Sequence, residues 1–148
     1  MAANSKVLLV DDSKFLRIAN ERALSRAGYD VSTAADGEEA LTLANDKLPD
    51  IILLDMLLPK ISGPDVLKAL KANPATKDIP VIVLSSLSQK NEEKLLNEGA
   101  AAYFEKSTLE LDKSSDRLAA AIEMVLRRVD HQKNLNLLLQ ASAAKAGH

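Results

Sequence analysis

Residues 7–13 read Val-Leu-Leu-Val-Asp-Asp-Ser, a short apolar run that ends on two acids and a hydroxyl. The run lacks the polar–apolar alternation of a strand with one face in water, so it predicts a strand buried on both faces. Residues 51–54 (Ile-Ile-Leu-Leu) and 81–84 (Val-Ile-Val-Leu) have the same character, and each is followed by a polar residue. Three such strands predict a parallel sheet with helices on both sides.

The segments between these runs have helical periodicity. Helices are expected at 13–27, 37–47, 63–72 and 88–98, with a last helix that begins between Thr108 and Asp116. Asp36 with Glu39 three residues later predicts a capping box for the second helix, and weaker strands at 29–34 and 101–105 suit the sheet edges. The strict alternation predicts an α/β fold: a five-stranded parallel, doubly wound (βα)5 sheet of flavodoxin-like order 2-1-3-4-5, with an extended C-terminal helix.

Length and composition predict the domain organisation and exclude several classes of function. The 148 residues favour one domain, which we place at 1–129, followed by a C-terminal helical extension at 130–148 with no output domain. The sequence has no cysteine, which excludes disulfides and thiolate catalysis. The net charge of −2 gives no general attraction to nucleic acid or to a membrane surface. With no signal-like or membrane-spanning apolar run, a cytoplasmic location is expected.

Polar residues follow the predicted strands at their carboxyl ends, which meet at one edge of an open parallel sheet. They are Asp11, Asp12, Asp55, Ser85 and Lys106. Three carboxylates brought together repel one another, and oxygen-only ligands point to Mg²⁺ as the cation that offsets this. A carboxylate nucleophile, Mg²⁺, a hydroxyl and an ammonium group form a site for phosphoryl transfer. An alternative for Asp12-Ser13 is a simple helix N-cap.

The motifs in this order resemble those of response-regulator receiver domains of two-component signalling, over about residues 5–128. The resemblance rests on residues 7–13, on Asp55-Met56-Leu57-Leu58-Pro59 with Ser62-Gly63, on residues 79–86 and on residues 99–106. It implies that a sensor histidine kinase is the partner and that its phosphohistidine phosphorylates Asp55. It also implies that Asp12, Asp55 and the backbone carbonyl of Leu57 ligate Mg²⁺ directly, whereas Asp11 acts through water.

The resemblance further implies how the switch operates. Lys106 would pair with the phosphoryl group, Ser85 would move to hydrogen-bond it, and Tyr103 would rotate inward, although a tyrosine on an edge strand can also simply pack. Two departures stand out. Ser107 stands where receivers usually have a proline after a cis peptide bond, which costs about 3 kcal/mol before a non-proline residue. The positions flanking the phosphoryl group, Leu57 and Leu87, are aliphatic where they are often polar.

Three functions fit these residues to different degrees. The first is a switch whose phosphorylation alters a surface read by a downstream protein or by a second copy, and which catalyses only its own phosphorylation and dephosphorylation. The second is a phosphorelay carrier that passes its phosphoryl group to a histidine phosphotransfer protein; the sequence does not separate these two. The third, a haloacid-dehalogenase-like phosphatase, needs an acid two residues after the nucleophile, where Leu57 stands. About twenty residues after Arg128 are too few for a DNA-binding domain.

The C-terminal segment has an apolar stripe and an unexplained group of leucines. Leu118, Ile122, Val125 and Val129 recur at helical spacing and predict a helix that docks on the sheet. Leu135, Leu137, Leu138 and Leu139 lie beyond it. Residues 130–134 form a polar interruption. We expect the extension either to pair with a second copy in a homodimer or to fold back on the fourth helix.

Overall fold

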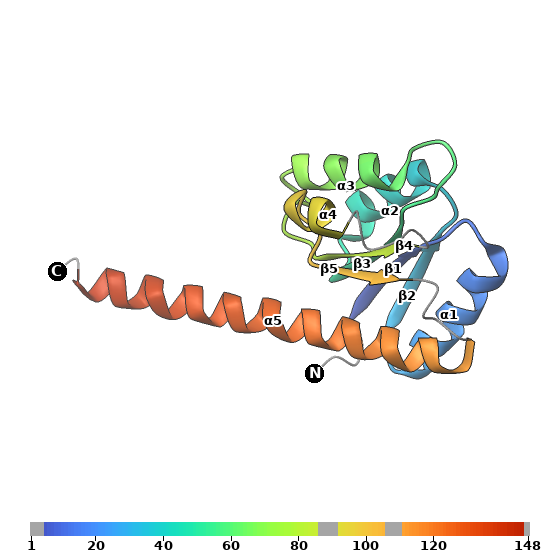
Figure 1. Cartoon of the computed structure of the whole chain (residues 1–148). Coiled ribbons are helices and arrows are strands. Elements are labelled where there is room, and N and C mark those ends of the chain that lie inside the picture. The colour runs from blue at the N-terminus through green and yellow to red at the C-terminus, as the bar shows by residue number, and fades with distance from the viewer. Residues whose placement is uncertain (1–4, 86–91, 106–110, 147–148) are drawn as a thin grey trace.

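The structure is a computed structural model of the chain and describes residues 5–85, 92–105 and 111–146. Its strands are β1 (Lys6–Val10), β2 (Asp30–Ala34), β3 (Ile51–Asp55), β4 (Val81–Ser85) and β5 (Ala102–Glu105). Its helices are α1 (Lys14–Arg26), α2 (Gly37–Lys47), α3 (Gly63–Ala72), α4 (Glu92–Asn97) and α5 (Leu111–Ala146). All neighbouring strands pair in parallel, in the order β2-β1-β3-β4-β5 (Figure 1). The predicted fold and strand order are therefore confirmed.

Both faces of the sheet are covered. Helices α2, α3 and α4 lie over one face, and α1 and α5 lie over the other (Figure 1). Successive residues of β1 alternate between the two layers: Leu8 and Val10 belong to the first cluster, and Val7 and Leu9 to the second. At most 1% of each of these side chains is exposed. The unbroken apolar runs in the sequence thus reflect burial on two sides.

The start of α2 follows the predicted capping box in part. Asp36 Oδ1 accepts the backbone N–H of Glu39 at 2.8 Å, as an N-cap should. The return bond differs from the expected one, because Glu39 Oε2 accepts the N–H of Ala35 at 3.5 Å, one residue before the cap. The end of α1 is likewise as expected, since Gly28 follows the C-cap with φ +101°.

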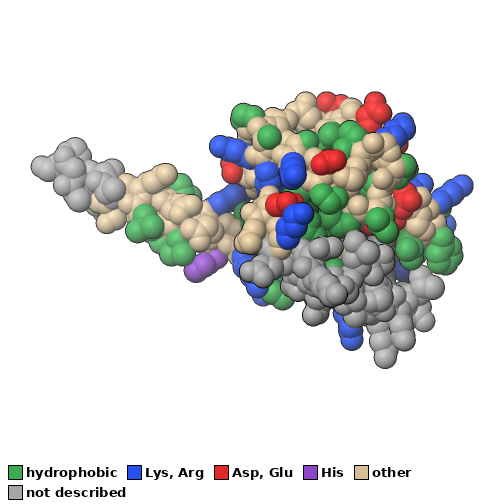
Figure 2. Space-filling model, turned by 45° about the horizontal axis from the view of Figure 1, so that its top comes forward, with side chains coloured by type: hydrophobic (Ala, Val, Ile, Leu, Met, Phe, Trp, Pro, Cys, Tyr) green, Lys and Arg blue, Asp and Glu red, His purple; other side chains and the backbone are tan. Residues whose placement is uncertain are grey.

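Helix α5 is continuous through residues 130–134, so the predicted extended C-terminal helix is confirmed and the polar interruption affects only the apolar stripe. Polar side chains end an apolar stripe but leave the backbone hydrogen bonds of a helix intact. In this stretch Gln132 Nε2 donates to Asn136 Oδ1 at 3.1 Å, across one turn. The C-terminal part of α5 runs straight away from the body (Figure 1, Figure 2), so folding back on α4, one of the two expected outcomes, is wrong, and pairing with a second copy stays a prediction. Within the part of the chain that the structure describes, no helix is both long and apolar enough to cross a membrane.

Candidate functional site: an acidic cluster at the end of the sheet

Asp11, Asp12 and Asp55 converge at the carboxyl edge of the sheet, as the sequence predicts. The parallel register pairs Val10 of β1 with Leu54 of β3, so the acids that follow lie beside each other. One carboxylate oxygen from each of the three acids lies within 4.8 Å of the others. Only 1% of Asp11 and 3% of Asp55 is exposed, whereas Asp12 faces solvent.

Asp11 is fixed through both its side chain and its backbone. Its Oδ1 accepts the N–H of Ser13 at 2.9 Å, and its carbonyl oxygen accepts Arg17 Nη1 at 2.8 Å. The N-cap of α1 is Ser13, whose Oγ accepts the N–H of Leu16 at 3.4 Å. Helix capping therefore does not account for Asp12. The contribution of Arg17 was not predicted, because an arginine in the second turn of a helix has no distinctive signal in the sequence.

The loop after β3 is held by main-chain bonds on both sides of Asp55. The N–H of Leu57 donates to Asp55 Oδ1 at 3.1 Å, and the N–H of Met56 donates to the carbonyl of Leu84 at 3.0 Å. Gly63 N–H donates to the carbonyl of Met56 at 3.1 Å. A Cβ on Gly63 would lie 2.4 Å from Met56 Cα, so only glycine permits this approach. The Leu57 side chain is 58% exposed.

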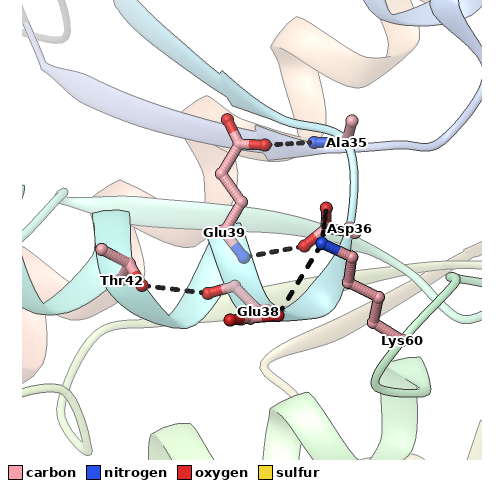
Figure 3. Close-up of polar contacts among 6 residues, drawn as sticks. All are labelled: Ala35, Asp36, Glu38, Glu39, Thr42 and Lys60. Atoms are coloured by element: carbon pink, nitrogen blue, oxygen red, sulfur yellow. Dashed lines mark hydrogen bonds and ion pairs between the residues drawn. The ribbon is translucent and has the colours of Figure 1, made fainter.

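The same loop is also tied to the start of α2 (Figure 3). Lys60 Nζ lies 3.5 Å from Asp36 Oδ2 and 3.8 Å from Glu38 Oε2. The N–H of Gly37 donates to the carbonyl of Pro59 at 3.5 Å, and a Cβ on Gly37 would come within 2.5 Å of the carbonyl oxygen of Ile61. The N–H of Glu39, and secondarily Lys60, lower the pKa of Asp36. We call these contacts between residues 36–38 and 59–61 the loop clamp.

The remaining predicted residues divide into two groups. Ser85 ends β4 with 2% of its surface exposed, one residue beyond the pairing of Asp55 with Leu84. Tyr103 of β5 is partly buried against the core under α2, α3 and α4, which agrees with a packing role and leaves its switching role a prediction. Lys106, Ser107 and Leu87 lie outside the described residues. The predictions for Lys106, for the Lys106–Ser107 peptide bond and for Leu87 therefore stay predictions.

The donor set suits a hard divalent cation. Its three carboxylates supply only oxygen ligands, and two of them are shielded from water, so their mutual repulsion is poorly screened. A cation such as Mg²⁺ would offset this repulsion and would retain water on the exposed Asp12 side. The acids present therefore fit the predicted ion.

Comparison with known proteins gives the family. The response regulator receiver domain family matches residues 7–123. A probable transcriptional regulator of Porphyridium aerugineum is 36% identical over 143 residues, which are 96% of this chain and 56% of that protein. The chain thus spans about half the length of that curated relative.

Solved structures of response regulators are also similar to this chain. The receiver domain of a putative LuxO repressor protein from Vibrio parahaemolyticus has a TM-score of 0.78 and 28% identity, covering 89% of this chain and 97% of that one. A phosphorylated cyanobacterial phytochrome response regulator, RcpA, has a TM-score of 0.73 and 33% identity, covering 84% and 95%. The Mn²⁺-bound response regulator Rcp1 has a TM-score of 0.69 and 27% identity, covering 78% and 90%. This chain belongs to the response regulator receiver domain family.

Proposed function

We propose that the chain is a phosphorylation switch in which Asp55 accepts a phosphoryl group, with Mg²⁺ bound, from the phosphohistidine of a sensor histidine kinase. The observation that carries this proposal is the cluster of Asp11, Asp12 and Asp55, whose carboxylate oxygens lie within 4.8 Å of one another. Two similar structures support it, since one is a phosphorylated response regulator and another binds Mn²⁺.

In the proposed reaction, an oxygen of Asp55 forms a new P–O bond as the P–N bond of the phosphohistidine breaks. The leaving imidazole keeps the electron pair of that bond. Asp12, Asp55 and the carbonyl of Leu57 would hold Mg²⁺, with Asp11 acting through water, and the bound ion would offset negative charge on the transferring group. The N–H of Leu57, 3.1 Å from Asp55 Oδ1, orients the nucleophile. Lys106 and Ser85 would then bind the phosphoryl oxygens, and Tyr103 would follow Ser85.

The exposed surface beside the site suits a protein donor. Phe15 lies three residues after Asp12, in the first turn of α1, and is 68% exposed. Ile18 one turn later is 37% exposed, and Leu57 in the loop after Asp55 is 58% exposed. Large apolar side chains in water next to a buried reactive group favour contact with another protein. We therefore propose the kinase, rather than a small metabolite, as the donor in the cell.

The test is phosphorylation of the full chain by a small phosphodonor in the presence of Mg²⁺, followed by intact mass. The wild type should gain one phosphoryl group and Asp55→Asn none. Asp46→Asn is the matched control, because Asp46 is an exposed acid of α2 outside the cluster, and it should label like the wild type. Equal labelling of Asp55→Asn and wild type would show that Asp55 is not the acceptor.

A further inference from the structure

Arg17 of α1 is bonded to both ends of the turn that carries two of the three acids. Its backbone N–H donates to the carbonyl of Ser13 at 2.8 Å. Its side chain donates through Nη1 to the carbonyl of Asp11, also at 2.8 Å, in a partly buried bond. A hydrogen bond from an ionised donor is about twice as strong as one between neutral groups. Arg17 is therefore well placed to fix the turn from Asp11 to Ser13.

The other bonds of this turn reach different groups of Asp11. Its N–H donates to the carbonyl of Ala34 at 3.1 Å, and its Oδ1 accepts the N–H of Ser13 at 2.9 Å. The bond from Arg17 adds the carbonyl of Asp11, which lies beyond the last paired residue of β1. Asp12 follows this carbonyl and faces solvent. Its main chain, rather than packing of its side chain, therefore determines where its carboxylate can reach.

The carbonyl held by Arg17 belongs to the peptide unit between Asp11 and Asp12. A peptide unit is planar, so its oxygen, its nitrogen and the two flanking Cα atoms move as one body. A bond to the carbonyl oxygen therefore limits rotation of the whole unit and limits the positions of the Asp12 Cα. Arg17 thus acts on the exposed acid of the cluster through the backbone, without contacting its carboxylate.

Arg17 would affect a bound cation in two opposite ways. Its positive charge repels the cation, so if charge were the main effect, removing Arg17 would tighten binding. Its bond to the Asp11 carbonyl holds the backbone of a ligand, so if this bond were the main effect, removing Arg17 would weaken binding. Groups that orient metal ligands are typically worth about 10–100-fold in affinity. The guanidinium bond ends on a neutral main-chain oxygen, which favours the second effect.

We propose that Arg17 is a positioning residue of the metal site, which holds the Asp11–Asp12 peptide so that Asp12 is placed for Mg²⁺ in particular. The inference rests on the proposed function, in which Asp12 ligates the ion. Mg²⁺ requires near-ideal octahedral geometry with short bonds, whereas Ca²⁺ accepts six to eight ligands in flexible geometry. A ligand whose position is fixed in advance therefore benefits Mg²⁺ more than Ca²⁺. Arg17 thus contributes to selection of the smaller ion.

Ion binding by the full chain, without a phosphodonor, tests this role separately from the chemistry at Asp55. Arg17→Ala should weaken Mg²⁺ binding about tenfold and Ca²⁺ binding about threefold or less. Arg22→Ala is the matched control, because Arg22 is an exposed arginine of the same helix, and it should bind both ions like the wild type. Calorimetric titration gives the dissociation constants. A thermal melt of each variant in chelator separates a loss of stability from a loss of affinity.

Arg17→Lys provides a second variant that keeps the positive charge. Lysine has a compact donor group on a flexible stem in place of the rigid fork of arginine, so Arg17→Lys should lose a smaller part of the preference for Mg²⁺. Tighter Mg²⁺ binding by Arg17→Ala, unchanged binding, or equal weakening for both ions would overturn the role of Arg17 while leaving the proposed function intact. A wild type that binds no Mg²⁺ would instead overturn the ion in the proposed function, and this inference with it.

Discussion

Leu57 is an aliphatic residue at a position beside the acceptor Asp55 that is often polar in receiver domains. Its N–H orients Asp55, while its aliphatic side chain, 58% exposed, flanks the place where the phosphoryl group would be. Hydrolysis of a phosphoaspartate needs a water held in line with the phosphorus, and a leucine has no group that can hydrogen-bond it. We therefore expect the phosphorylated chain to be long-lived.

Leu57→Asn should speed hydrolysis of phospho-Asp55 about tenfold, less than the 10²–10⁴ contributed by a positioned proton-transfer group. The rate is measured by intact mass after the phosphodonor is removed. Leu57→Met is the control and should decay like the wild type. Wild-type decay within seconds without a phosphatase, or no change in Leu57→Asn, would contradict this explanation.

At the scale of elements, the loop clamp ties the segment after β3 to the start of α2. Asp36 has two roles in it: its Oδ1 caps α2 through the N–H of Glu39, and its Oδ2 faces Lys60 across 3.5 Å (Figure 3). The ion pair itself is exposed, so its own contribution is small and sensitive to salt. The cap is the larger cause of the lowered pKa of Asp36.

This lowered pKa predicts a dependence of stability on pH. A carboxyl whose pKa is lower in the folded than in the unfolded chain stabilises the fold above its unfolded pKa, and that stability is lost as the pH falls through the folded pKa. The difference in thermal midpoint between wild type and Asp36→Asn should therefore shrink as pH falls below about 4. Lys60→Gln, which keeps the cap, should show a smaller effect. If the difference in thermal midpoint does not change with pH, the charge of the Asp36 carboxylate does not contribute to the stability of the fold.

At the scale of the whole molecule, the acidic cluster links folding to the bound ion. Two buried acids and one exposed acid within 4.8 Å repel one another when no cation is present. A ligand that binds only the folded chain stabilises it by about 2.7 kcal/mol at one hundred times its dissociation constant. Mg²⁺ should therefore raise the thermal midpoint of the wild type.

Whether Asp12→Asn or the wild type has the higher thermal midpoint should depend on Mg²⁺. In chelator Asp12→Asn should melt above the wild type, because one repelling charge is gone, and in Mg²⁺ it should gain less than the wild type. Asp46→Asn, outside the cluster, should respond to Mg²⁺ like the wild type in a thermal melt. Equal gains for Asp12→Asn and wild type would remove Asp12 from the ion's ligands.

Much of the fold could be predicted because it rests on local pattern. The apolar runs gave three central strands, and Ser62-Gly63-Pro64 and the Asp36 cap set the starts of α3 and α2. The meeting of Asp11, Asp12 and Asp55 followed from the topology, since parallel strands end at one edge. These features depend on neighbours in the chain or on a general rule of sheets.

Other features were decided only by the tertiary structure. Lys60 meets Asp36, and Arg17 meets the carbonyl of Asp11, through contacts that have no periodic signal. The sequence left open whether the extension pairs with a second copy or folds back on the fourth helix, and only the structure shows that α5 continues straight away from the body (Figure 1). The physical reason is that side-chain pattern reports which face is buried, whereas the course of a helix is set by its backbone hydrogen bonds and by what its faces meet in space.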